Sequence, residues 1–367
     1  MARWKCGTLS SAPSTQLQPF GQPVPAIGPG KPGQKAVCGG AHSRRSPVRS
    51  ARNSRSGVGP QVAENAAATA AFSQDLEALG ILYLYVNAPQ KLQRGEALLP
   101  TGVEEYGNES ADAFLEELER QGTDYVDLRP LFEENGIYSN WFFRTDHHWK
   151  PEAAFFAWQA LTDELEGRYG LAADPALTDP ANWDTRVLEH FFLGSQGKRV
   201  GSLYAGADDI TLYTPKFDSE LTYSCPAYGF TRTGPFETSV CFPERVAQQD
   251  WFNGNPYTYY AGGDYPIATI TNHKNPDGPR VVLLRDSFAC ALTPFLALSC
   301  GELITIDLRY FHDDLLSYVD WLEPDVGLVM YTAGSLALDP LFDFFPAGDF
   351  CLDTYQSAPP IAQKPEL

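Results

Sequence analysis

The chain has 367 residues, of which 43% are hydrophobic and 13% aromatic, a composition that excludes an intrinsically disordered protein. The formal net charge is −19, but residues 1–60 contain nine Lys and Arg and no acid, which leaves 18 bases and 46 acids, or −28, for residues 61–367. Because so acidic a body repels phosphates, we expect no nucleic-acid partner.

The two ends of the chain differ from its middle. Residues 1–60 are rich in Pro, Gly, Ser and Arg without a periodic apolar pattern, so we expect a disordered basic tail. No stretch approaches the roughly 20 apolar residues of a transmembrane helix, and no signal peptide is readable near Met1. We expect the ordered domain over residues 61–345 and a C-terminal tail over 346–367.

Helices and strands alternate along the expected domain. Its first part predicts a helix over 62–79 that ends at Gly80, a strand over 81–86, a helix over 110–120, a strand over 125–128, and a helix over 151–169 between Pro151 and Gly170. Its last part predicts strands over 267–271, 281–284, 303–306 and 326–331, and helices over 287–298 and 313–321. Continuous apolar strands between helices are typical of a largely parallel α/β sheet covered on both faces.

Residues 171–265 have many Gly, Pro, Asn, Tyr and Thr and only short alternating segments, which predicts a β-rich and loop-rich insertion. The seven cysteines show no zinc-like spacing. Cys225 and Cys241 flank a turn-rich part of this segment, and two alternatives stay open for them: a disulfide, or two separate buried thiols.

A serine lies where the apolar strand expected over 281–284 gives way to a helix, in Arg285-Asp286-Ser287-Phe288. Ligands of open α/β sheets bind at the carboxyl ends of strands, where a serine exposes its hydroxyl. The free amides and the dipole at the start of the next helix can stabilise an oxyanion. Asp and Ser are also ordinary N-cap residues, so this motif alone fits a structural role as well.

A carboxylate and an imidazole lie two positions apart in Arg144-Thr145-Asp146-His147-His148-Trp149. In an extended chain Asp146 and His148 point the same way, so the aspartate can orient the imidazole, whereas His147 points to the opposite side. We therefore expect His148 to be the histidine of a nucleophilic catalyst built with Ser287.

Two alternatives apply to this segment. Asp146 can be a turn residue beside two packing histidines, or the group can bind a metal, since His and Asp are common ligands. The remaining histidines have no ligand-like spacing to the pair; they are His42, His190, His273 and His312. We therefore expect no metal and no other cofactor.

Several segments together resemble the bacterial DHHW proteins, which are similar to the SGNH-hydrolase-like domains of the alginate O-acetylation machinery. Spread over roughly residues 62–340, they are Tyr83-Leu84-Tyr85-Val86, Pro89-Gln90-Lys91, Thr145-Asp146-His147-His148-Trp149 with Pro151-Glu152-Ala153-Ala154, Phe192-Leu193-Gly194-Ser195-Gln196-Gly197-Lys198, Gly262-Gly263, Arg285-Asp286-Ser287-Phe288, Pro294-Phe295-Leu296 and Asp307-Leu308-Arg309-Tyr310-Phe311. The resemblance implies a three-layer α/β/α fold in which the Asp-x-His pair precedes the serine.

The resemblance also implies a function. It implies a triad of Ser287, His148 and Asp146 that acts on acetyl esters of a cell-surface or extracellular polysaccharide, an extracytoplasmic location, and a membrane protein as acetyl donor. Two features depart from the family pattern: residues 1–60 contain no membrane segment, and Arg285 precedes Asp286 where ordinary SGNH hydrolases have Gly-Asp.

Five further residues are candidates for oxyanion stabilisation or substrate contact. Gly262 or Gly263 can lend a backbone amide, or they form a plain turn. Arg309 can hold an anionic sugar or form a surface salt bridge. Tyr260 can stack on a sugar ring or pack in a core, as can the other aromatic residues of the insertion. His147 is the fifth candidate.

An acyl-enzyme can pass its acetyl group to a sugar hydroxyl or to water, so the expected function is acyl transfer or ester hydrolysis, and the resemblance favours transfer. A non-catalytic glycan-binding or scaffold protein of an exopolysaccharide assembly is the main alternative. A metal-dependent hydrolase is the other.

Overall fold

The computed structural model describes residues 59–95, 99 and 105–346. The tails expected over 1–60 and 346–367 lie almost wholly outside these residues. Within the described ranges, no helix combines the length and the apolar character needed to span a membrane.

The order of the elements follows the predicted alternation. The first half contains α1 (Pro60–Ala78), β1 (Leu82–Ala88), α2 (Gly107–Gln121), β2 (Tyr125–Asp127), α3 (Arg129–Glu134), α4 (Pro151–Tyr169), α5 (Pro175–Thr178), β3 (Trp183–Phe192), α6 (Ser195–Val200), α7 (Ser202–Ala205) and β4 (Asp208–Pro215). The second half contains β5 (Leu221–Cys225), β6 (Phe230–Gly234), α8 (Phe236–Ser239), α9 (Glu244–Ala247), β7 (Ile267–Asn272), β8 (Arg280–Arg285), α10 (Ala289–Ser299), β9 (Glu302–Ile306), α11 (Leu315–Leu322) and β10 (Val326–Thr332). Pro151 opens α4 and Gly170, in the left-handed conformation, closes it, as the sequence predicts.

The main sheet has eight strands in the order β2-β1-β10-β8-β9-β7-β5-β6. The five strands from β2 to β9 pair in parallel, and β7, β5 and β6 continue the sheet in antiparallel pairs. The parallel half confirms the α/β fold class. The strand over 267–271 is correctly predicted but runs against β9, because its direction depends on the long segment that precedes it.

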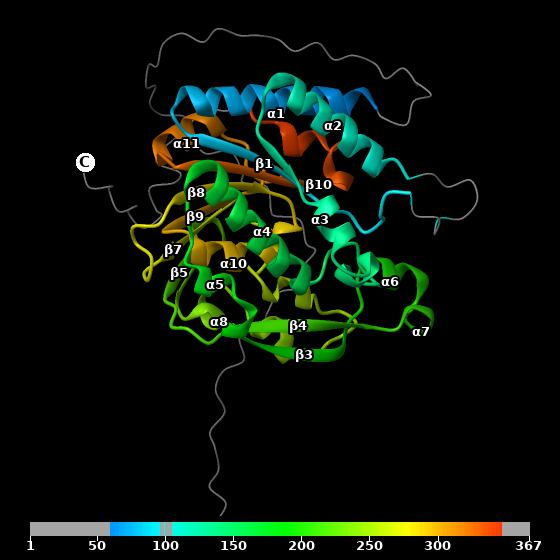
Figure 1. The fold of residues 1–367 in the computed structure, drawn as a ribbon. Helices are drawn as coiled ribbons and strands as arrows, with labels where there is room; N and C mark the ends of the chain where they lie inside the picture. Colours follow the sequence, from blue (N-terminus) through cyan, green and yellow to red (C-terminus); the bar gives the residue numbers. More distant parts are fainter. Residues whose placement is uncertain (1–58, 96–98, 100–104, 347–367) are drawn as a thin grey trace, which may run out of the picture. The chain divides into compact units, whose positions relative to one another are not determined.

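Helices cover both faces of this sheet, so the domain has three layers. Figure 1 shows α1, α2 and α11 on one face, and α4 and α10 on the other. Alternate side chains of each strand enter the two cores: Tyr83 and Tyr85 face the first group of helices, and Leu84 and Val86 face the second. Each fully buried side chain of this size contributes roughly 1.5–3 kcal/mol to the folded state.

The parallel arrangement brings the carboxyl ends of four strands to one edge. The register pairs Ala88 of β1 with Thr332 of β10, and Met330 of β10 with Arg285 of β8. Leu284 of β8 pairs with Ile306 of β9. The loops that follow these strands therefore meet, and they include the segment with Ser287.

Residues 171–265 form four strands and several short helices. β3 and β4 make a separate two-stranded antiparallel sheet, while β5 and β6 extend the main sheet. Cys225 and Cys241 are both buried free thiols, and Cys225 Sγ lies 3.3 Å from the carbonyl oxygen of Ile267. Of the two alternatives for this pair, the disulfide is therefore wrong and the separate thiols hold.

Candidate active site

The serine turn, residues 286–288, connects β8 to α10. Asp286 is buried, and its Oδ1 accepts a hydrogen bond from the amide of Phe288 at 2.9 Å. Its Oδ2 accepts from the amide of Thr332 at 3.2 Å and from Ser335 Oγ at 2.8 Å, and burial raises the pKa of this carboxyl. Asp286 thus ties the turn to the end of β10, while Ser287 stays partly exposed.

The histidine loop is a bent segment closed at its base. Phe142 and Trp149 form an isolated antiparallel bridge, and residues 144–148 between them are bends. Trp149 Nε1 donates to the carbonyl oxygen of Phe288 at 2.9 Å, and Tyr257 Oη donates to the same oxygen at 2.8 Å. The Trp149 bond joins the histidine loop directly to the serine turn, and the Tyr257 bond joins residues 171–265 to the same turn.

The structure brings Ser287, His148 and Asp146 together. His148 Nε2 lies 2.8 Å from Ser287 Oγ, and His148 Nδ1 lies 2.6 Å from Asp146 Oδ1. An ionised carboxylate can only accept, so Nδ1 carries the proton and Nε2 is free to accept the serine hydroxyl. Burial alone would raise the pKa of Asp146, but the hydrogen bond to His148, the charge of that ring and the amide of Ser195 outweigh burial and lower it.

Asp146 is also held by the start of α6. Its Oδ2 accepts a hydrogen bond from the amide of Ser195 at 2.7 Å. A Cβ at Gly194 would lie 2.3 Å from Asp146 Cβ and 2.6 Å from the carbonyl oxygen of Thr145, so only glycine allows this close approach. Residues 192–198 were noted only as part of the family resemblance, because nothing local signals that they support a loop almost 50 positions earlier.

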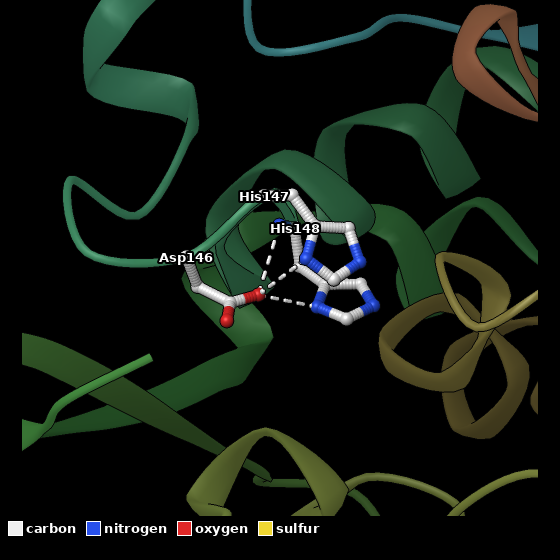
Figure 2. A group of neighbouring side chains, drawn as sticks. All are labelled: Asp146, His147 and His148. Atoms are coloured by element: carbon white, nitrogen blue, oxygen red, sulfur yellow. Dashed lines mark hydrogen bonds and ion pairs between the residues drawn. The ribbon is translucent and has the colours of Figure 1, made fainter. Parts of the chain in front are cut away.

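His147 lies on the same side of Asp146 as His148 (Figure 2). The two ring centroids are 3.9 Å apart, and His147 Nδ1 is 3.3 Å from Asp146 Oδ1. The expectation that His147 points the opposite way is wrong, because the loop is bent rather than extended. His147 has a side chain 50% exposed, against 12% for His148. Burial, and then the charge of His148, lower the pKa of His147.

Asp146, His147 and His148 are the one group in the described part of the chain whose possible metal-ligand atoms lie within 4.8 Å of one another. Both ring nitrogens of His148 and both oxygens of Asp146 are already engaged in the hydrogen bonds above. The donor set is therefore used for a serine–histidine–aspartate arrangement, and we assign no metal to it.

An ion-pair network links the turn that contains Gly262 and Gly263, the glycine turn, to the serine turn. Fully buried Arg285 donates through Nη2 to the carbonyl oxygen of Gly263 at 2.6 Å and through Nη1 to Asp264 Oδ1 at 3.0 Å. Arg309 pairs with Asp264 at 2.9 Å and with Asp307 at 2.6 Å. Arg309 therefore forms salt bridges, and its contact with an anionic sugar stays a prediction.

The two glycines of this turn face different surroundings. Gly262 has φ 75°, and a Cβ there would lie 2.5 Å from Phe242 Cζ. Gly263 has φ 142°, and a Cβ there would meet nothing within 4 Å. Gly263 therefore opens into free space next to the serine turn, and its role as an oxyanion donor stays a prediction.

The aromatic residues of 171–265 divide between core and surface. Tyr260 is fully buried, and its hydroxyl donates to the carbonyl oxygen of Thr211 and accepts from the amide of Tyr213, so it is wrong as a sugar-stacking residue. Tyr257 is buried and stacks on His148 with ring centroids 4.2 Å apart, a contact that the sequence did not indicate. Trp251 and Phe252 are exposed.

The layered sheet and the serine at its carboxyl edge are similar to those of SGNH-hydrolase-like domains. Residues 49–198 match the model of the family "SGNH hydrolase-like domain, acetyltransferase AlgX", which confirms the resemblance seen in the sequence. A comparison with curated proteins gives no match.

Several solved structures share this fold. PatB1 of Bacillus cereus is 23% identical with a TM-score of 0.64 over 77% of this chain and 92% of PatB1. Its form with a sulfonyl adduct is likewise 23% identical, with a TM-score of 0.64 over 78% and 93% of the two chains. A DHHW family protein from Eubacterium siraeum is 20% identical with a TM-score of 0.61 over 79% and 90%.

Proposed function

We propose that this protein is a serine-dependent acyl transferase that moves an acetyl group to or from the hydroxyls of a polysaccharide outside the cytoplasm. The observation that carries the proposal is the pair of contacts at His148, 2.8 Å to Ser287 Oγ and 2.6 Å to Asp146 Oδ1. Both contacts lie within hydrogen-bonding distance of a general base and its orienting carboxylate.

The first half-reaction forms an acetyl-enzyme. His148 Nε2 takes the hydroxyl proton as Ser287 Oγ attacks the acetyl carbonyl carbon, and Asp146 stabilises the imidazolium. The tetrahedral oxyanion is stabilised by the amide of Ser287 and by that of Gly263. When the intermediate collapses, the ester C–O bond of the donor breaks and His148 returns the proton to the leaving oxygen.

The second half-reaction decides between a transferase and an esterase. An acceptor hydroxyl loses its proton to His148 and attacks the acetyl carbonyl. The acyl C–O bond to Ser287 then breaks, and His148 returns the proton to Ser287 Oγ, which completes the cycle. A sugar hydroxyl gives transfer, and water gives hydrolysis. The match to an acetyltransferase family model supports transfer, and a membrane protein as acetyl donor is part of the same proposal.

An activated acetyl ester tests the proposal on the purified full chain. Incubation with and without oligosaccharide acceptors, followed by mass spectrometry, separates acetylated sugar from free acetate. We expect Ser287→Ala to reduce turnover by at least about 10³-fold, since removal of a triad nucleophile removes the covalent route.

The matched control is Ser139→Ala, at an exposed position of the short helix Tyr138–Trp141, which should retain wild-type turnover. Because a PatB1 structure carries a sulfonyl adduct, a sulfonyl fluoride is a suitable second probe. Peptide mapping should find it on Ser287. Equal turnover of wild type and Ser287→Ala would overturn the serine mechanism, and absence of turnover in the wild type would leave the non-catalytic glycan-binding alternative.

A further inference from the structure

Lys91 contacts the histidine loop from the segment that follows β1. Its Nζ donates to the carbonyl oxygens of Arg144 and Asp146, each at 2.8 Å, and to Gln196 Oε1 of α6 at 2.7 Å. An ammonium group has three N–H donors, so this arrangement uses all of them. Three segments that are far apart in the sequence therefore converge on one side chain.

The partners of Lys91 differ from those of most cations in the described part of the chain. In the described ranges, ten Lys and Arg side chains have a carboxylate oxygen within 4.0 Å: Arg94, Arg120, Arg129, Arg168, Lys216, Arg232, Lys274, Arg280, Arg285 and Arg309. Lys91 instead directs its charge at two backbone carbonyls and one amide oxygen. Burial lowers the pKa of Lys91, and the charges of Asp208 and Asp146 oppose this shift.

Residues from outside the histidine loop make hydrogen bonds to its backbone amides and carbonyl oxygens. Asp208 accepts from the amides of Arg144 and Thr145, and the amide of Gly197 donates to the carbonyl oxygen of Thr145 at 2.7 Å. Lys91 supplies the donors for the two carbonyls on either side, those of residues 144 and 146. The course of the chain immediately before His148 therefore depends on Lys91.

We propose that Lys91 is a positioning residue: it fixes the loop that presents Asp146 and His148 to Ser287, and it places a positive charge near the His147 imidazole. The catalytic meaning of this inference rests on the proposed function. The geometric part of the inference, that the Asp146–His148 contact depends on Lys91, is independent of the proposed function.

The geometric role predicts a loss of activity without loss of fold. A displacement of about 1 Å in a catalytic group costs on the order of 100-fold in rate. We expect Lys91→Met to lower kcat/KM for the activated acetyl ester by about that factor, with most of the loss in kcat. Circular dichroism and thermal melting should show a folded protein, because the released carbonyl of Arg144 reaches solvent.

The charge predicts a shift in the pH profile. His148, Asp146, Lys91 and Arg199 of α6 act on the charge of His147, and Tyr257 stacks on His148. Asp208 of β4 and Arg144 of the loop act on Lys91, while the carboxylate of Asp286 is directed at β10. Loss of the Lys91 ammonium removes a repulsion against a protonated imidazole in the loop. We therefore expect the acidic limb of kcat/KM to move to higher pH in Lys91→Met. Lys91→Arg keeps the charge and should leave the limb in place, although its planar head cannot reproduce the three contacts.

A spectroscopic measurement separates this inference from the proposed function. The proton between His148 Nδ1 and Asp146 Oδ1 should give a strongly downfield proton resonance, which is absent from Asp146→Asn. We expect the resonance to be lost or shifted in Lys91→Met and retained in Lys216→Met, a matched control at an exposed lysine paired with Asp184.

A wild-type resonance together with wild-type kinetics in Lys91→Met would overturn the positioning role. If the wild-type chain has no esterase or transferase activity, the proposed function fails while the resonance still decides the role of Lys91. Should Lys91→Met not fold, Lys91→Gln carries the same comparison, since it removes the charge and keeps a polar head.

Discussion

Both oxygens of the Asp146 carboxylate are committed in the folded protein. Oδ1 accepts from His148 Nδ1 at 2.6 Å and from the His148 amide at 3.1 Å, while Oδ2 accepts from the amide of Ser195. The two oxygens therefore have different roles: Oδ1 selects the imidazole tautomer, and Oδ2 holds the carboxylate on α6. An uncharged side chain of the same shape would keep the position and lose the tautomer.

We accordingly expect Asp146→Asn to lower kcat for the activated acetyl ester by roughly 10³- to 10⁴-fold, as a misoriented histidine tautomer does in other triads. Steady-state kinetics with circular dichroism as a fold check measures this effect. Asp163→Asn, the same chemical change on the exposed side of α4, should leave kcat unaltered. A reduction of less than tenfold in Asp146→Asn would show that this carboxylate does not orient the catalytic base.

At the scale of elements, α6 and the histidine loop approach so closely that position 194 has room only for glycine. A methyl group at Gly194 would overlap Asp146 Cβ and the backbone of Thr145. Backbone atoms cannot yield as the end of a flexible side chain does, so the loop and the helix have to separate. The contact between the Ser195 amide and Asp146 would then lengthen.

Gly194→Ala should therefore reduce kcat/KM by about 100-fold and lower the free energy of unfolding by about 1–3 kcal/mol, the range typical of overpacking. Chemical denaturation and ester kinetics provide the two values. Gly167→Ala is the paired control: this glycine lies inside α4 with nothing within 4 Å of an added Cβ, so alanine should stabilise the protein by up to about 1 kcal/mol. Unchanged kinetics in Gly194→Ala would mean that α6 does not set the position of Asp146.

For the whole molecule, the dominant electrostatic fact is the surplus of acids, with a formal net charge of −19 for the chain. Repulsion among unpaired carboxylates destabilises the compact state, and salt screens that repulsion. The exposed ion pairs oppose this trend only weakly, because each is worth at most about 1 kcal/mol. We expect the melting temperature at pH 7 to rise by a few degrees between about 0.01 M and 0.15 M NaCl; a fall would mean that the ion pairs outweigh the repulsion.

Local patterns in the sequence were sufficient for most of the parallel half of the sheet. The apolar runs at 281–284 and 326–331, and the helix between Pro151 and Gly170, are found where periodicity and capping place them. The direction of β7 was not predictable in this way, because it depends on β5, which pairs with it from a segment of mixed composition.

In the candidate site, too, the residues of each motif were predictable, whereas the contacts between distant segments were not. The motifs contained Ser287, Asp146 and His148, but the orientation of His147 depends on a bend that no spacing rule indicates. Lys91 and Asp208 act through backbone atoms of residues 144–146 that are more than 50 positions away in the sequence. Contacts of this kind arise only when the chain is folded, and no pattern within a single segment encodes them.

The position of β10 has a consequence for how the protein is made. This strand lies between β1 and β8, so the first strand of the described chain finds its central neighbour only with the pairing of Leu82 and Val326, far along the polypeptide. Contacts of such long range slow folding. A ribosome-bound chain that has not yet been extended to residues 326–332 therefore leaves one backbone edge of β1 and one of β8 without a partner strand, and the sheet is completed only once that segment is made.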